Sequence, residues 1–263
     1  MSTTSSSPTV NVEVSDLPSF PKIWESHPIE HEVFSEDGSV RLRVCRGGIF
    51  ISATNGWLTI SQYFKVKLDL CVEERQIGQL TYRLVNGNYI DDFHEELESS
   101  GMGGQQLESL SSFLFNADGT LRETWRIGVQ SGTRIFGPEL SAKKTKFALL
   151  DCCDNPFPGD YLVIEDAIRR RGIASWAVQR LFEQLRAEGV KYILTWPSVP
   201  RINPDLRGSA TEEQLLQRNL AFVRKVGFRR VGLSPVFAYM LLDDNHPSRT
   251  LPKDHDMNPP RPL

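Results

Sequence analysis

The sequence has no hydrophobic run long enough to cross a membrane, and its first residues do not form a secretory signal. Met1-Ser-Thr-Thr-Ser-Ser-Ser-Pro8 has neither a basic start nor an apolar centre. The chain also has no large excess of one charge, since 30 Lys and Arg residues oppose 33 Asp and Glu residues. This balance does not favour a nucleic-acid or membrane-surface partner.

Cysteine is scarce as well, and its four positions are scattered: Cys45, Cys71, Cys152 and Cys153. Their spacing fits neither a disulfide scaffold nor a zinc site, so we expect reduced thiols and no metal. Together with the missing signal, this predicts a soluble protein that is not secreted. We expect it in the cytoplasm or the nucleus.

The length of 263 residues and the 40% hydrophobic content are enough for one substantial core. Residues 1–20 are rich in Ser, Thr and Pro, and the residues after 242 contain several prolines, so we expect both ends to be flexible. The predicted organisation is one domain over residues 21–242, between a flexible N-terminus and a flexible tail at 243–263. No chemistry is expected in either end.

The most informative segment changes its hydrophobic period. Residues 161–164 form a short apolar run, which is typical of a buried strand, whereas the apolar positions after Ser175 have helical spacing. These helical positions are Ala177, Val178, Leu181, Phe182 and Leu185. The sequence therefore predicts a strand, a tight loop over residues 169–174, and a helix.

The loop between them has the composition of an anion site. Gly172 and Ala174 have little or no side chain, so a bulky anion can approach the backbone where the helix start supplies unpaired N–H groups. Arg169, Arg170 and Arg171 add positive charge and offset the acidic residues just before them. The pattern predicts a phosphate-binding loop.

The flanking segments predict an α/β chain in which this loop is central. Before it, residues 40–44, 64–72 and 76–85 alternate as strands, and the last two form a hairpin. After it come a strand at 191–196, a helix at 212–226 that is closed by Gly227-Phe228, and a final strand at 236–242. The helix has apolar positions Leu215, Leu216, Leu220, Phe222 and Val223.

At the loop the chain resembles the GNAT superfamily of N-acetyltransferases, whose signature is Gln/Arg-x-x-Gly-x-Gly/Ala. Arg169-x-x-Gly172-x-Ala174 matches this signature. The resemblance implies an α/β (α+β) GNAT fold, with a central mixed, mostly antiparallel twisted sheet that is flanked by helices and splayed at the cofactor strand. The alternative is a generic α/β core that binds no coenzyme A, because short Gly-x-Ala motifs also occur by chance.

In this family the loop holds the pyrophosphate of acetyl-coenzyme A, and the preceding strand binds the pantetheine arm. By position, the resemblance places Leu162, Val163 and Ile164 beside the pantetheine. The loop and first helical turn would bind the pyrophosphate, and Asn219 would contribute to the same site. The loop residues are Arg169, Arg170, Arg171, Gly172, Ile173, Ala174 and Ser175.

The reaction implied by the resemblance is direct attack of an acceptor amine on the acetyl thioester in a ternary complex. The expected base is a carboxylate near the end of the cofactor strand, and Glu165 or Asp166 occupies that place. Backbone N–H groups near Ile164 would stabilise the developing oxyanion. Equally, either carboxylate could be a plain surface residue.

The chain departs from the family at the residue that protonates the leaving thiolate. The usual tyrosine falls on Val223, and the usual asparagine falls on Leu216, with Asn219 one turn further on. Tyr161, Tyr192 and Tyr239 are substitutes by residue type only. Two hypotheses therefore remain: an N-acetyltransferase acting on an amine of a small molecule, peptide or protein lysine, and a non-catalytic acyl-coenzyme A binding module.

A long insert at residues 86–150 separates the hairpin from the cofactor strand. Within it we expect a helix at 105–114, a turn at 116–119, and extended segments at 121–125 and 146–150. Residues 131–137 are similar to a stretch in uncharacterised fungal GNAT-like proteins, which indicates no substrate. The insert either covers the acceptor end of the cleft or extends an edge of the sheet.

The insert contains an acidic segment, residues 91–98, with the single histidine His94. One histidine among acids lacks further ligands at metal-site spacing, so we expect a solvated helix face or attraction for a cationic acceptor amine. His27 and His31 lie in a polar segment and are expected at the surface.

Overall fold

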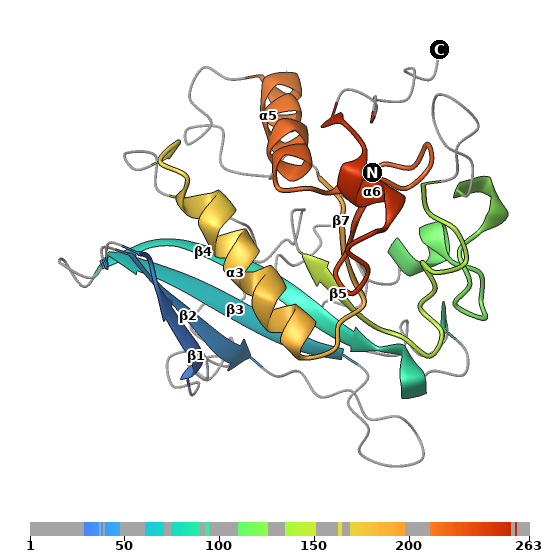
Figure 1. The fold of residues 1–263 in the computed structure, drawn as a ribbon, viewed down its shortest axis with the longest axis horizontal. Helices are drawn as coiled ribbons and strands as arrows, with labels where there is room; N and C mark the ends of the chain where they lie inside the picture. The colour runs from blue at the N-terminus through green and yellow to red at the C-terminus, as the bar shows by residue number, and fades with distance from the viewer. Residues whose placement is uncertain are drawn as a thin grey trace, which may run out of the picture.

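One open β-sheet with helices against it forms the frame of the protein (Figure 1). The computed structural model describes residues 29–36, 38, 40–47, 61–70, 75–89, 93–94, 110–125, 135–150, 163–164, 169–197, 211–253 and 256. In sheet order the strands are β1 (Ile29–Phe34), β2 (Val40–Gly47), β3 (Ser61–Leu70), β4 (Arg75–Asn86), β5 (Lys146–Leu150), β7 (Tyr192–Thr195), β9 (Phe237–Met240) and β8 (Arg229–Arg230), and β6 (Val163–Ile164) pairs with β4. The helices are α3 (Ile173–Ala187), α5 (Glu212–Lys225) and the short α6 (Pro247–Thr250), with 3-10 turns η3 (Gly87–Tyr89) and η4 (Glu123–Trp125).

The first four strands form an antiparallel meander whose register follows the alternation of apolar and polar residues. Leu42 pairs with Leu68, and Val66 pairs with Leu80, so apolar positions lie opposite one another along the meander. Leu42 and Leu80 are fully buried. The predicted strand at residues 40–44 and the predicted hairpin that ends at residue 85 are confirmed.

The centre of the sheet contains a parallel pair. β5 lies between β4 and β7, antiparallel to β4 and parallel to β7, and every other pairing in the described part of the chain is antiparallel. The extended segment predicted at 146–150 is therefore a central strand, and this part of the insert does not extend a sheet edge. By contrast, the extended segment predicted at 121–125 is wrong, because η4 occupies residues 123–125.

β5 and β6 lie along the same side of β4, one after the other. Leu150 pairs with Tyr82, and Val163 pairs with Gln79, so only Leu80 and Thr81 of β4 separate the two pairings. β7 accompanies β5 up to the pair of Leu150 with Thr195 and is not paired with β6 in the described residues. The pairing of the sheet therefore changes at the carboxyl end of β5, beyond which β6 continues along β4 without a described pairing to β7. We call this place the break in the sheet.

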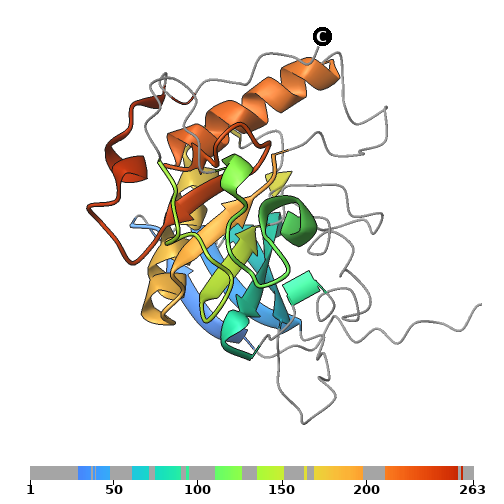
Figure 2. The ribbon, with the colours of Figure 1, turned by 90° about the vertical axis from the view of Figure 1, so that its right-hand side faces the viewer.

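The sheet separates two apolar cores, because neighbouring residues of each strand point to opposite faces. On β5, Ala148 belongs to the core shared with α3 and α5, whereas Phe147 belongs to the core shared with residues 110–125 and 135–142. Figure 2 shows α3 on one side of the sheet and the green segments, which contain these residues, on the other. Burial on both faces explains why β5 is a continuous apolar run after Lys146.

Both predicted long helices are present: α5 matches the predicted range 212–226 to within one residue, and α3 begins at Ile173, inside the loop predicted at 169–174. The buried residues of α3 are Ala177, Val178, Leu181, Phe182 and Leu185, as the helical spacing indicates. On α5, Thr211 caps the first turn in a capping box with Gln214, and Leu220 and Val223 are buried. Gly189 follows α3 with φ +74°, a conformation that favours glycine at a helix end.

Gly87, at the end of β4, is a packing-critical glycine, for which we predict a large effect. Its N–H donates to the Thr145 carbonyl at 2.8 Å, and a Cβ here would lie 1.8 Å from the Ala142 carbonyl oxygen. Gly87→Ala should lower the free energy of unfolding by about 3 kcal/mol or more, because backbone must move. Denaturant unfolding measures this. Gly38→Ala is the control: its φ of +68° makes the substitution cost about 1–2 kcal/mol, but a Cβ there meets nothing within 4 Å, so its loss should be smaller. Equal losses in both variants would contradict the packing described.

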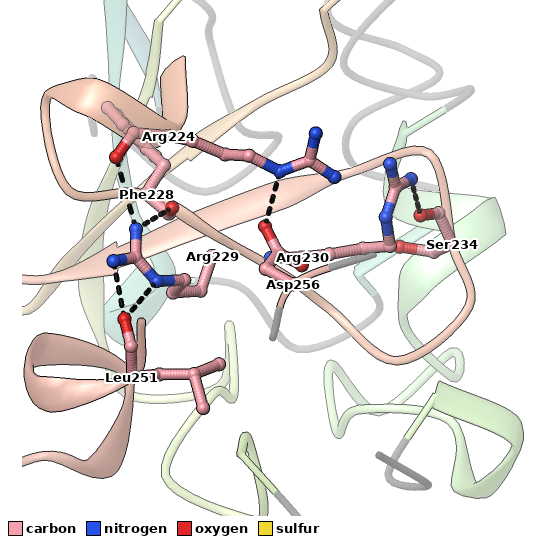
Figure 3. Close-up of polar contacts among 7 residues, drawn as sticks. All are labelled: Arg224, Phe228, Arg229, Arg230, Ser234, Leu251 and Asp256. Carbon is pink, nitrogen blue, oxygen red and sulfur yellow. Dashed lines mark hydrogen bonds and ion pairs between the residues drawn. The ribbon is translucent and has the colours of Figure 1, made fainter. Parts of the chain in front are cut away.

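The prediction of a flexible tail is wrong for residues 243–253 and 256. His246, Ser248 and Asp256 are buried in this segment. Figure 3 shows Asp256 between two arginines: its carboxylate lies 3.1 Å from Nε of Arg224 and accepts the N–H of Arg230 at 3.1 Å. The prolines therefore stop regular pairing without keeping the segment off the domain.

The arginines under this segment are themselves buried. The guanidinium of Arg229 donates to the carbonyls of Phe228 and Leu251 (Figure 3). The guanidinium of Arg230 donates to the Ser234 carbonyl and lies 4.5 Å from the centre of the Phe237 ring. Burial lowers the pKa of Arg230 to about 10, although Asp256 acts against this shift.

Taken together, the strands and helices form a mixed α/β structure with a mostly antiparallel, open sheet flanked by helices.

Candidate functional site

The loop before α3 has an unusual backbone conformation. Arg170 has φ +66° and Gly172 has φ +85°, so two left-handed residues alternate with Arg171. Such alternation turns successive N–H groups toward one point and is a common anion-binding geometry. A left-handed arginine is uncommon, because only glycine adopts this conformation without a steric cost.

Gly172 connects this loop to the helix. It is the N-cap of α3, and its carbonyl accepts the N–H of Trp176 at 3.0 Å. The N–H groups of the first turn, from Ile173 to Ser175, precede any intrahelical acceptor, and Gly172 has no side chain to cap them. A Cβ added at Gly172 would meet nothing within 4 Å, so the space in front of the helix start is open.

The charge around the loop is positive. The side chains of Arg169, Arg170 and Arg171 are exposed, in line with the predicted basic loop. The helix dipole adds positive potential at the same place. The structure therefore brings three predicted features together: open space, the uncapped start of a helix and basic side chains.

The first turn of α3 also contains a buried donor. Trp176 packs with Ile173 and Ala174 against the core that α3 shares with α5. Its indole Nε1 is buried, and no residue in the described part of the chain accepts its hydrogen. A buried donor without an acceptor costs free energy, and a ligand oxygen beside the first turn would remove that cost.

The predicted strand residues are described only in part. Val163 and Ile164 form β6, which lies directly before the loop and beside the break in the sheet. Leu162, Glu165 and Asp166 lie outside the described residues, as does Tyr161. The predicted roles of both carboxylates remain predictions.

Two of the three predicted positions on α5 belong to the apolar core. Val223 is buried in the apolar core, so the position of the family's tyrosine faces other hydrophobic side chains. Asn219 is half-buried on the same helix, and Leu216 packs at the margin of the core. α5 therefore helps to hold α3 in place through a shared apolar face.

Of the three candidate tyrosines, Tyr192 and Tyr239 are described, and both are packing residues. Tyr192 is fully buried on the sheet face opposite α3, stacked on Phe147, and burial raises its pKa well above the ordinary value. Tyr239 lies in the core of α3, with its ring centre 4.3 Å from that of Phe182, and burial raises its pKa too. Neither phenol is suited to give up a proton near neutral pH.

The histidines have structural partners as well. The His94 ring is half-buried, and its Nε2 lies 3.2 Å from the Phe115 carbonyl oxygen. Residues 93–94 are the only described part of the predicted acidic segment.

Across the described residues, no group of three or more His, Cys, Asp or Glu side chains could hold a metal ion. Likewise, no described helix is long and apolar enough to cross a membrane.

One arrangement that the sequence analysis missed joins a serine, a histidine and a glutamate. Nδ1 of His246 lies 2.8 Å from Oγ of Ser248, and Nε2 lies 3.3 Å from Oε1 of Glu139. These residue types can form a nucleophilic triad. However, Ser248 is only 1% exposed, and its N–H donates to the same Nδ1 at 3.2 Å. The arrangement therefore caps α6 and leaves no room for a substrate.

Comparison with known proteins adds no name to this site, because no family model and no curated protein sequence matches the chain. The resemblance to acetyltransferases therefore depends on the sequence motif Arg169-x-x-Gly172-x-Ala174.

Proposed function

We propose that the protein is an acyl-coenzyme A-dependent N-acetyltransferase that moves an acetyl group from acetyl-coenzyme A to a primary amine. One observation carries the proposal: the left-handed, basic loop at the start of α3 lies directly after β6, at the break in the sheet. Gly172 is open on its Cβ side, so the loop has room for a phosphate group. A pyrophosphate is the anion that suits a helix start of this kind.

Different residues of this chain bind different parts of acetyl-coenzyme A. The N–H groups from Arg170 to Ser175 hold the pyrophosphate, and the arginine side chains add charge-assisted contacts. The indole N–H of Trp176 is available for a carbonyl oxygen of the ligand. The backbone of Val163 and Ile164 orients the pantetheine arm along the open side of β6, and Asn219 supports the same ligand from α5.

Acetyl-coenzyme A supplies an activated acyl group, and the chain supplies proton transfer and positioning. Glu165 or Asp166 accepts the proton of the acceptor amine, directly or through water, so that the neutral amine can attack the carbonyl carbon. The N–H near Ile164 stabilises negative charge on the carbonyl oxygen. Because Val223 is buried, the thiolate takes its proton from solvent.

The carboxylate role leads to a prediction for two variants. Glu165→Gln and Asp166→Asn should both keep the affinity for coenzyme A, whereas one of them should lose turnover by about 100-fold. The loss should be largest near neutral pH, where the amine is protonated and a base is needed most. Initial rates of thiol release measure it. If both variants keep the wild-type rate, neither carboxylate is the base.

The second candidate function is a non-catalytic acyl-coenzyme A binding module. Val223 favours it, because this residue stands where the family usually has its acid and its apolar side chain has no proton to donate. Thiol release from acetyl-coenzyme A, assayed across pooled primary amines, separates the two functions. Amine-dependent turnover supports the enzyme, and saturable coenzyme A binding without any turnover supports the binding module.

A further inference from the structure

Three aromatic side chains meet beside the break in the sheet. The Phe113 ring stacks on Trp125, with 4.7 Å between the ring centres and 27° between the planes, and it lies 5.5 Å from the Trp196 ring at 34°. We call Phe113, Trp125 and Trp196 the aromatic trio. All three are only half-buried, although they pack on the core opposite α3. Large aromatic side chains that gather in one place and keep part of their area exposed are candidates for a contact surface.

The trio stands at the end of the parallel strand pair. Trp196 directly follows Thr195, the last β7 residue that pairs with β5. The loop of Gly172 lies on the face of α3, whereas the trio packs on the opposite face. A donor held at the loop and an acceptor held at the trio would therefore reach the break from opposite sides of the sheet.

The trio is held rigidly. The indole N–H of Trp125 donates to the Phe113 carbonyl at 2.7 Å, which fixes η4 against the helical turn at 110–114. On the other side, a Cβ at Gly232 would lie 2.5 Å from the Trp125 carbonyl oxygen, so the turn before β9 packs directly on η4.

We propose that the aromatic trio is the acceptor-binding surface and that the acceptor is a primary amine with a planar aromatic group. This inference rests on the proposed function for its amine. The planar group follows from the trio itself, because near-parallel ring faces favour stacking and the Trp125 indole N–H already has its acceptor. Such a surface contributes little binding free energy to a flexible, multiply charged amine, which has no flat ring to stack on it.

The test compares acceptors that differ in one property. With acetyl-coenzyme A saturating, 2-phenylethylamine should have a KM about 10-fold below that of 2-cyclohexylethylamine, which has a similar size but no flat ring. Trp196→Ala should raise the KM for 2-phenylethylamine about 10-fold, and the KM for ethylamine, which has no ring to stack, should rise far less. Trp196→Phe should restore most of the loss. Equal KM values for both ring amines would overturn the proposal.

Phe34→Ala is the matched control, because Phe34 is an aromatic residue that is 51% exposed on β1, at the far edge of the sheet. Its kinetics should equal those of the wild type. Thermal melting of each variant shows whether it is folded, and Trp196→Leu replaces Trp196→Ala if the latter melts early. A KM increase in Phe34→Ala as large as in Trp196→Ala would contradict a local role of the trio.

A binding measurement keeps this inference separate from the proposed function. Saturation-transfer NMR of 2-phenylethylamine with the full chain and free coenzyme A needs no turnover. Contact of the phenyl protons with wild type, lost in Trp196→Ala, supports the trio even if no amine is acetylated. If other amines are acetylated but phenyl contact is absent, the trio proposal fails while the proposed function stands.

Discussion

Replacing Gly172 by glutamate is expected to abolish coenzyme A binding, with a loss of affinity of at least 100-fold. The new side chain would fill the open space in front of the α3 N-terminus and set a negative charge among the N–H groups that we assign to pyrophosphate. Its backbone would also be strained, because φ at this position is +85°. Isothermal titration calorimetry with coenzyme A measures the loss.

The chain offers a matched control at the other end of the same helix. Gly189 also has a positive φ, +74°, and a Cβ there also meets nothing within 4 Å. Gly189→Glu therefore introduces the same side chain with similar backbone strain, at the end of α3 where the dipole is negative. It should keep wild-type affinity. If both variants lose binding equally, the cause is damage to α3 and not the loss of an anion site.

Removing the buried carboxylate of Asp256 should cause the largest loss of stability. Asp256→Ala would leave Arg224 and the N–H of Arg230 without this partner, in a region where the Asp256 side chain is 1% exposed. Breaking a buried ion pair from one side costs about 3–5 kcal/mol. For a chain of this size, that loss lowers the melting temperature by about 10 °C.

Asp244 is the control for this second variant. It forms exposed ion pairs with Arg186 and Arg249 in the same C-terminal segment, and solvent screens such pairs. Asp244→Ala should therefore leave the melting temperature almost unchanged in calorimetry. If Asp256→Ala also melts like the wild type, residue 256 does not hold the segment to α5 and β8, and the description in Figure 3 is wrong.

The sequence predicts those elements of the fold whose signal is local. The buried positions of α3, from Ala177 to Leu185, follow from helical spacing alone, and the hairpin of β3 and β4 follows from alternation. Pairing between distant segments has no such signal. Nothing local shows that β7 pairs with β5, or that β5 and β6 lie in line along β4.

The C-terminal segment was mispredicted because its order depends on partners that are far away in the sequence. Four-residue α6 cannot form by its own propensity, and it depends on the His246 cap and on the ring of Phe136, which stacks on His246. Asp256 depends in the same way on Arg224. Counting prolines captures none of these contacts.

In the candidate site, too, only the features with a local sequence signal are predictable. Gly172 at a helix start was predictable, because only glycine suits that position without strain. The left-handed conformation of Arg170 was not, since arginine has no preference for it. The aromatic trio has no sequence signal at all, because Phe113, Trp125 and Trp196 come from three separate segments.

A crystal structure with coenzyme A bound tests the central claim most directly, because it shows where the pyrophosphate lies. We expect difference density for the pyrophosphate within hydrogen-bond distance of the N–H groups from Arg170 to Ser175. The pantetheine arm should run along β6 into the break beside β7. Coenzyme A bound anywhere else, or no binding in solution at millimolar concentration, would contradict the account.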